Sequence, residues 1–367
     1  MLLSHADLEC LRLAAWCKDL PQNTTQYLHA DTVTHLVLVE YLRKSKCGLS
    51  YRLTDKGYDV LEQAGYHFDR DKQYLGKSKT LSRRLELAEI TLFLHSLDAD
   101  VFIENATQVN PALCFMPSFA IRRAKSSNVL GGTRLSGFLY TQENVLVPYY
   151  ISDGGIYPNV EQQTFCAEYL SKKKKPVVIY TGKPELPALV HAAYHAEQPK
   201  FRTKAKSFAQ SIDIFLYPVC FVPLSKNGIR QLRIMCQPDY RKTLAKILLQ
   251  NDGYIESDNL WCDAINKKHG EPFLVGFDFN LKGFDEAVKM AKGKKLHIAV
   301  LDFQAEDATK YLKSKKAKAS IYPIEIKLVE DALDLPAGLR VPEEITPYQT
   351  KEGGYISVTN FETDRKA

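Results

Sequence analysis

Residues 46–58 read KCGLSYRLTDKGY, and this stretch decides the fold expected for the N-terminal part of the chain. Gly48 marks a turn, and apolar residues then alternate with polar ones from Leu49 to Leu53, as in a strand with one buried face. Thr54 is a favourable N-terminal cap, so a helix is expected to start directly after it. The stretch therefore predicts a turn, a strand and a helix in immediate succession.

The segments that precede this stretch are expected to be helical. Ser4 followed by Asp7 resembles a capping box, and Pro21 ends the helix that they open. Residues 24–28 are a candidate for a short second helix. Asp31 is expected to cap a third helix, whose apolar residues have helical spacing: Val33, Leu36, Val37 and Tyr41.

This order of elements resembles winged helix-turn-helix proteins over residues 4–66. The resemblance implies that the third helix reads DNA bases while the strand-turn-strand forms a wing that contacts phosphates. Short polar side chains and basic residues suit those two tasks. The candidate contacts of the helix and its end are Thr32, Thr34, His35, Arg43 and Lys44, and those of the wing and the following helix are Lys46, Arg52 and Lys56.

The local charge leaves a second interpretation open. Residues 1–66 hold seven Lys+Arg and eight Asp+Glu, whereas DNA-binding modules are usually more basic. Winged helices also dock on other proteins. A protein partner, or a second copy of this chain, therefore remains an alternative to double-stranded DNA.

Residues 67–84 are expected to be a linker, since they hold six basic residues against two acidic ones. The linker could follow a phosphate backbone or serve only as a solvated connector. A second basic run lies at 118–134, where four basic residues meet no acid and a Gly-Gly pair would permit close approach of a ligand. Its candidate DNA contacts are Arg122, Arg123, Lys125 and Arg134, with a solvated loop as the alternative.

The rest of the chain is expected to be a mixed α/β domain at 85–250, a small C-terminal α/β domain or extension at 251–335, and a tail at 336–367. Strands are expected at 100–104, 135–141, 145–151, 177–181, 212–221, 231–236, 273–279, 296–303 and 321–328. The pair 135–141 and 145–151 is expected to form a hairpin. Helices are expected at 159–171, 184–196, 284–291 and 307–314.

The chain as a whole resembles the replication-relaxation proteins of Gram-positive plasmids and integrative or conjugative elements. The resemblance rests on the expected winged helix, the basic linker and an α/β domain that contains TRLSGFL at 133–139. The resemblance implies a DNA-binding accessory or regulatory protein of a mobile element, acting in replication, transfer or transcription control without being an enzyme. Some members of that family resemble restriction endonucleases. Such a nuclease needs a metal-binding acid on one strand and Glu-x-Lys on the next, and the predicted hairpin has neither. Asp153 follows the second strand without those partners. We therefore expect a degenerate form of the restriction-endonuclease fold, without an active site.

Two other sets of residues are candidates for chemistry. Asp302, Glu325 and Lys327 superficially fit a metal-dependent nuclease, which is the alternative function, because Mg²⁺ needs carboxylates and a nearby lysine. His191 and His195 have the spacing of two ligands on one helix face, but no Glu follows His191. Packing or surface positions are the better interpretation of these histidines.

Composition bounds these interpretations. The 367 residues carry a net charge of +6, and 45% of them are hydrophobic, which is typical of a globular protein and excludes a disordered one. No signal peptide or membrane span is evident, and the eight cysteines include no close pair, so we expect a cytoplasmic protein with reduced thiols. We expect no cofactor, no structural metal and no membrane partner.

Overall fold

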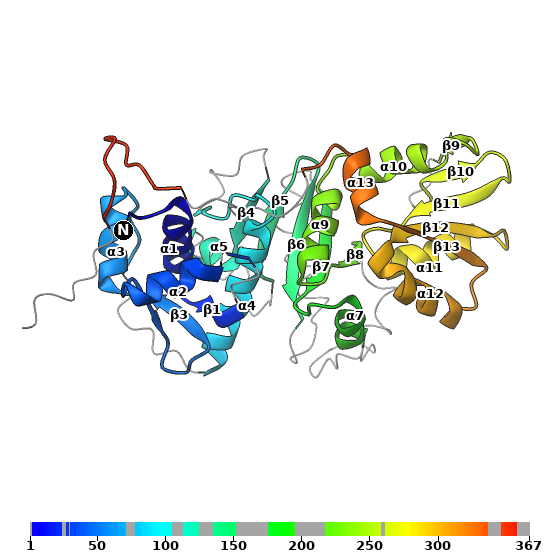
Figure 1. Cartoon of the computed structure of the whole chain (residues 1–367). Helices are drawn as coiled ribbons and strands as arrows, with labels where there is room; N and C mark the ends of the chain where they lie inside the picture. Colours follow the sequence, from blue (N-terminus) through cyan, green and yellow to red (C-terminus); the bar gives the residue numbers. More distant parts are fainter. Residues whose placement is uncertain are drawn as a thin grey trace, which may run out of the picture. The chain divides into compact units, whose positions relative to one another are not determined.

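The protein is a mixed α/β protein, and its described residues form three β-sheets; Figure 1 shows the arrangement of the elements. The computed structural model describes residues 2–23, 27–28, 30–70, 78–104, 113–124, 135–151, 175–194, 217–257, 261–336 and 346–357. The chain divides into two compact units, one of Met1–Ser96 with Arg340–Ala367 and one of Leu97–Leu339. In the described residues, no helix is both long and apolar enough to cross a membrane.

The first unit combines helices with a small antiparallel sheet. Its elements are α1 (His5–Cys17), β1 (Leu20–Pro21), α2 (Ala30–Leu38), β2 (Leu42–Lys44), β3 (Ser50–Leu53), α3 (Asp55–Gln63) and α4 (Ser78–His95). The three strands are arranged in the order β1-β3-β2. The strand and helix expected from residues 46–58 are therefore confirmed as β3 and α3.

Helix α1 is the centre of this unit because it is apolar on nearly all sides. It contacts α2, α3, α4 and β3, and Leu11, Leu13 and Trp16 are buried among them. The expected capping box is confirmed: the Asp7 amide donates to the Ser4 hydroxyl, and Asp7 accepts from the Ser4 amide. The predicted cap at Thr54 is confirmed as well, since its hydroxyl accepts from the Gly57 amide.

Residues expected to form a linker and a tail contribute to the first unit. Helix α4 begins at Ser78, inside the basic stretch 67–84. The segment 346–357 forms isolated bridges from Pro347 to Ser4 and from Ser357 to Leu2. The Tyr348 ring also meets the His5 ring edge-on at 5.3 Å.

The second unit contains two five-stranded sheets. The first has the order β4-β5-β6-β7-β8, with β6, β7 and β8 parallel and the other pairs antiparallel. These strands are β4 (Cys114–Pro117), β5 (Gly137–Tyr140), β6 (Asn144–Tyr150), β7 (Lys175–Thr181) and β8 (Val219–Phe221), with helices α5 (Ser118–Ala124), α7 (Leu186–Tyr194) and α9 (Lys226–Met235). The hairpin expected at 135–151 is confirmed as β5 and β6, in which Leu139 pairs with Leu146. At Gly137, whose φ is +156°, a Cβ would lie 2.4 Å from the Met116 carbonyl, so glycine is required for β4 to approach.

The second sheet has the order β13-β12-β11-β10-β9, in which β11, β12 and β13 are parallel. Its strands are β9 (Tyr254–Glu256), β10 (Ala264–Asn266), β11 (Glu271–Val275), β12 (Leu296–Leu301) and β13 (Ala319–Ile324). The helices are α10 (Tyr240–Leu248), α11 (Leu281–Met290), α12 (Ala305–Ser314) and α13 (Ile326–Ala332), with a 3-10 turn η4 (Asp302–Gln304).

Buried polar groups join the two sheets within this unit. The Gln231 side-chain amide donates to the carbonyls of Phe221 and Phe277, at 3.0 and 2.9 Å. Arg241 lies 3.0 Å from Asp263 and 3.8 Å from Asp278, whose pKa is raised by burial. The Gln231 amide thereby links strand β8 of one sheet to the segment that follows β11 of the other.

Several expected strands differ in the structure, and those expected at 273–279 and 296–303 end early, at Val275 and Leu301. Residues 231–235 of the strand expected at 231–236 belong to helix α9, where Ile229, Leu232 and Met235 repeat every third residue and are buried. Residues 100–104 form no strand, and only Asp100 makes an isolated bridge. The strand expected at 321–328 ends at Ile324, and α13 follows it. The helix expected at 159–171 lies outside the described residues.

Candidate nucleic-acid interface

The hairpin formed by β2 and β3 carries three of the predicted contact residues on its surface. Leu42 pairs with Leu53 and is buried, whereas Arg43 and Lys44 are both exposed. Lys46 is exposed in the loop that joins the strands. Among the described residues, none of the three cations has an ion-pair partner.

The loop of this hairpin is held by its own hydrogen bonds. The Ser45 amide donates to the Ser50 carbonyl at 2.8 Å, and the Gly48 amide donates to the Ser45 carbonyl at 2.9 Å. Gly48 adopts a φ of +74°, which favours glycine over other residues. The basic side chains therefore project from a defined turn.

Cys47 lies at the tip of the same loop and is exposed. Its sulfur lies 3.2 Å from the Ser45 hydroxyl, and hydrogen bonds with Ser45 and the Leu49 backbone lower the pKa of this thiol. Burial instead raises the pKa of Cys10, and it raises that of Cys17 to about 12. Cys47 is thus a reactive reporter inside the basic hairpin.

Arg52, a predicted DNA contact, stabilises the fold instead. Its Nε donates to the Asp19 carboxylate at 2.6 Å, and Arg84 from α4 reaches the other Asp19 oxygen at 2.9 Å. Asp19 is fully buried and also accepts from the Ser50 hydroxyl. A buried carboxylate needs such partners, so Arg52 and Arg84 are held in this cluster.

Helix α2 presents fewer of its predicted contacts than expected. Thr34 is exposed, whereas Thr32 is 4% exposed and faces the core, so Thr32 cannot reach a base edge in this conformation. His35 is half-buried, and its Nδ1 lies 3.1 Å from the Asp7 carboxylate. The exposed stripe of the helix consists of Asp31, Thr34 and Leu38.

Lys56 is the remaining predicted contact of the first unit. It is exposed at the start of α3 and forms an ion pair with Glu40. Sequence reasoning missed the three acids that engage the predicted basic residues, namely Asp7, Asp19 and Glu40. No local pattern marks them, because each lies more than ten residues from its partner.

The basic run at 118–134 is only partly described. Residues 118–124 form helix α5, on which Arg122 is exposed. The Arg123 backbone belongs to the same helix, but its side chain is outside what the structure describes, as are Lys125 and Arg134. The run is therefore a helix over its first seven residues, where a loop was the alternative.

Of the three residues of the alternative nuclease, the structure places two at the ends of neighbouring strands and the third on a helix. Leu301 pairs with Ile324, so Asp302 and Glu325 follow the ends of neighbouring parallel strands, and both are exposed. Lys327 does not extend that strand, because it lies in the first turn of α13. A Glu-x-Lys motif holds both side chains on one face of one strand, and this arrangement is absent here.

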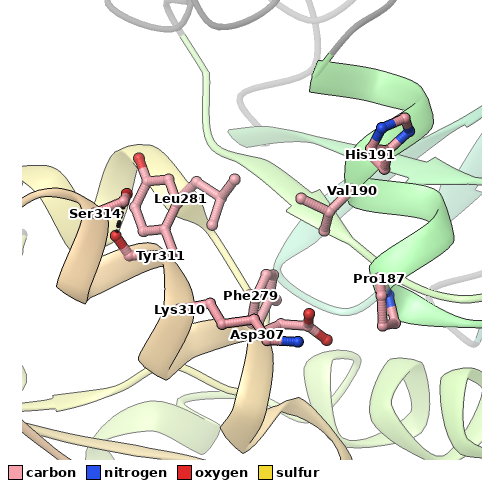
Figure 2. A pocket seen from close by; sticks show the side chains of 9 residues that line it. All are labelled: Pro187, Val190, His191, Phe279, Leu281, Asp307, Lys310, Tyr311 and Ser314. Atoms are coloured by element: carbon pink, nitrogen blue, oxygen red, sulfur yellow. Dashed lines mark hydrogen bonds between the residues drawn. The ribbon is translucent and has the colours of Figure 1, made fainter.

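The described residues contain no group of three or more His, Cys, Asp or Glu that could hold a metal ion. His191 lies on α7 as predicted, and His195 is outside the described residues. His191 borders a cavity of about 310 Å³ between α7 and α12 (Figure 2). Its walls include the apolar side chains of Val190, Phe279 and Leu281, together with the charged Lys310 and Asp307.

Comparison of the chain with protein-family models, with curated proteins and with solved structures gives no match. The geometry of the residues is therefore the basis for assigning a function.

Proposed function

We propose that the protein binds double-stranded DNA through its first unit, with the hairpin β2–β3 on the phosphate backbone and helix α2 toward the base edges. The observation that carries the proposal is the exposed set Arg43, Lys44 and Lys46, which has no carboxylate partner among the described residues. The order of helices and strands, and the strand order β1-β3-β2, resemble those of a winged helix and support the same proposal.

The two elements have different tasks in this proposal. The hairpin cations neutralise phosphates, which provides affinity without reading sequence. Thr34 offers a hydroxyl to a base edge, and the exposed Leu38 offers an apolar contact to a thymine methyl group. Asp31 on the same stripe disfavours close approach of phosphate to this part of the helix.

The resemblance to replication-relaxation proteins supports a narrower proposal. In that proposal the protein is a non-enzymatic accessory or regulatory factor of a mobile element, acting in replication, transfer or transcription control. Exposed cationic contacts on the hairpin suit this role, since such a factor must recognise DNA without cutting it.

A protein-docking function is the second candidate, and two exposed apolar residues favour it. Leu38 on α2 is 72% exposed, and Leu49 in the hairpin loop is 55% exposed. Large apolar side chains at such positions are common at protein interfaces. In the docking alternative, these leucines would contact a partner and the hairpin cations would be dispensable.

The experiment measures binding of the full chain to a DNA duplex over a range of salt concentrations. The variant Arg43→Gln/Lys44→Gln/Lys46→Gln should bind more weakly, and the slope of log affinity against log salt should become shallower by about 1 for each phosphate that the variant no longer neutralises. The matched control is Lys18→Gln/Arg70→Gln/Lys351→Gln, which removes three charges from the same unit outside the hairpin.

Equal binding by the hairpin variant and the wild type would overturn the proposal. If Leu38→Ser/Leu49→Ser instead abolished binding of a protein partner, the docking function would replace it. Circular dichroism and the midpoint of thermal unfolding establish that each variant is folded.

A further inference from the structure

The parallel strands β11, β12 and β13 begin at the same edge of their sheet, and a lysine-rich loop precedes each of them. The register pairs Phe273 with His297 and Leu296 with Ala319. The loops at 267–270, 292–295 and 315–318 therefore lie side by side, although they are far apart in the sequence.

Hydrogen bonds between the loops agree with this arrangement. The Lys294 ammonium donates to the Gly270 carbonyl at 2.9 Å, and the Leu296 amide donates to the Lys318 carbonyl at 3.0 Å. We call the side chains of the three loops the lysine edge. Its eight members are Lys267, Lys268, Lys292, Lys294, Lys295, Lys315, Lys316 and Lys318, and all but the half-buried Lys295 are exposed.

The lysine edge is not the result of a generally basic composition. Residues 251–336 contain 13 lysines and no arginine against 15 Asp+Glu, so this part of the chain is slightly acidic. The acids Asp278, Asp302 and Glu325 follow the opposite ends of the same three strands, whereas the acid Glu271 opens β11 at the lysine-rich end. More than half of the lysines thus gather at one edge.

Helix dipoles explain only part of this gathering. Lysines favour the C-terminal end of a helix, which accounts for Lys292 after α11 and for Lys315 and Lys316 after α12. Helix dipoles do not account for Lys267 and Lys268, which follow a strand, nor for Lys318, which lies further beyond the helix end.

Internal ion pairs neutralise little of the edge. Lys315 lies 3.0 Å from Asp285, and its ammonium lies over the Tyr311 ring. For the other seven lysines, no ion pair with a described residue is present. Crowded like charges destabilise a fold, so such an edge indicates a polyanionic partner.

We propose that the lysine edge binds the sugar-phosphate backbone of double-stranded DNA without reading its sequence. Lysine is a flexible point charge and lacks the planar fork of arginine, which suits phosphate neutralisation. Single strands are bound by stacking on exposed aromatic rings. The three loops contain no such ring, since their one ring-bearing residue is His269.

An anionic membrane is a less suitable partner. Segments that bind membrane interfaces combine lysines with bulky apolar anchors, and the three loops contain none. The lysine edge is a contact in addition to the hairpin β2–β3, and it does not depend on DNA binding by that hairpin. It would add to the backbone affinity of the hairpin, because residues 1–66 as a whole are nearly neutral.

The test is duplex binding by the full chain with one lysine of each loop neutralised, in the variant Lys268→Gln/Lys292→Gln/Lys316→Gln. A duplex of arbitrary sequence should bind about tenfold more weakly at moderate salt, and the salt slope should become shallower by about 2 to 3. The matched control Lys226→Gln/Lys282→Gln/Lys327→Gln removes three charges from the same unit at other positions and should bind as the wild type does. Thermal unfolding confirms that both variants are folded.

The outcomes separate this inference from the proposed function. If the hairpin variant loses binding while the lysine-edge variant and its control behave alike, the inference is overturned and the proposed function stands. If only the lysine-edge variant loses binding, the inference stands without the hairpin. A third outcome concerns membranes. If the wild type binds vesicles rich in anionic lipid and the lysine-edge variant does not, while both bind the duplex equally, the inference is also overturned.

Discussion

Arg43 and Arg52 face each other across strands β2 and β3, yet their surroundings differ. The Arg43 side chain is exposed, whereas Arg52 binds the fully buried Asp19. Like charges opposite each other in a sheet usually repel, and here one of them is neutralised by an internal carboxylate. The comparison teaches that a cation is available to a polyanion only where the fold provides no acid for it.

The largest effect is expected at the acid that creates this difference. Asp19→Ala should destabilise the first unit by about 3 kcal/mol, because it leaves Arg52 and Arg84 without their buried partner. Urea unfolding followed by fluorescence of Trp16, in a Trp261→Phe background, measures the change. The exposed Asp69→Ala, outside any helix, is the control, with a change below about 0.5 kcal/mol. A decrease of less than about 1 kcal/mol for Asp19→Ala would mean that the cluster is not essential.

Replacing Arg52 should affect mainly stability, and replacing Arg43 should affect mainly duplex binding. Arg52→Ala is expected to lower stability by about 1 to 2 kcal/mol, since the Asp19 carboxylate loses one of its donors. Arg43→Ala should leave the free energy of unfolding within about 0.5 kcal/mol and make the salt slope of duplex binding shallower by about 1. The reverse pattern, with Arg43 important for stability and Arg52 for binding, would contradict the comparison.

A smaller effect is expected at the two threonines of α2, which repeat the contrast between exposed and buried residues. Thr34→Ala should reduce the difference in binding free energy between the best duplex and a random duplex by about 1 kcal/mol, because it removes a hydroxyl that can reach a base edge. Thr32→Val keeps the buried volume and should leave that difference unchanged. Selection of bound sequences from a randomised pool measures both, and a change with Thr32 alone would contradict the proposed orientation of the helix.

Local patterns are sufficient to predict much of the fold. The capping box at Ser4 and the hairpin at 135–151 involve residues close in sequence, so spacing alone indicates them. Helix α9 escapes prediction because Gln231 and Arg233 alternate with apolar residues in the short window 231–236, as they would in a strand. Its helical period becomes visible only when the preceding Ile229 is included.

Predictions of the site residues depend on information that the local sequence does not contain. Arg43, Lys44 and Lys46 are exposed on the hairpin, as expected for contact residues. Arg52 and His35 cannot be told apart from them, since their partners Asp19 and Asp7 are distant in sequence. The lysine edge is equally hidden, because the parallel pairing of three strands brings its loops together.

The central claim, that the hairpin β2–β3 contacts DNA, is tested most directly by the rate at which iodoacetamide alkylates Cys47. The lowered pKa of this exposed thiol makes it reactive at lower pH than an ordinary cysteine, and the Cys47→Ser variant identifies its share of the labelling. A saturating duplex should slow alkylation of Cys47 several-fold, and high salt should restore the rate. An unchanged rate while the duplex is bound would contradict the claim.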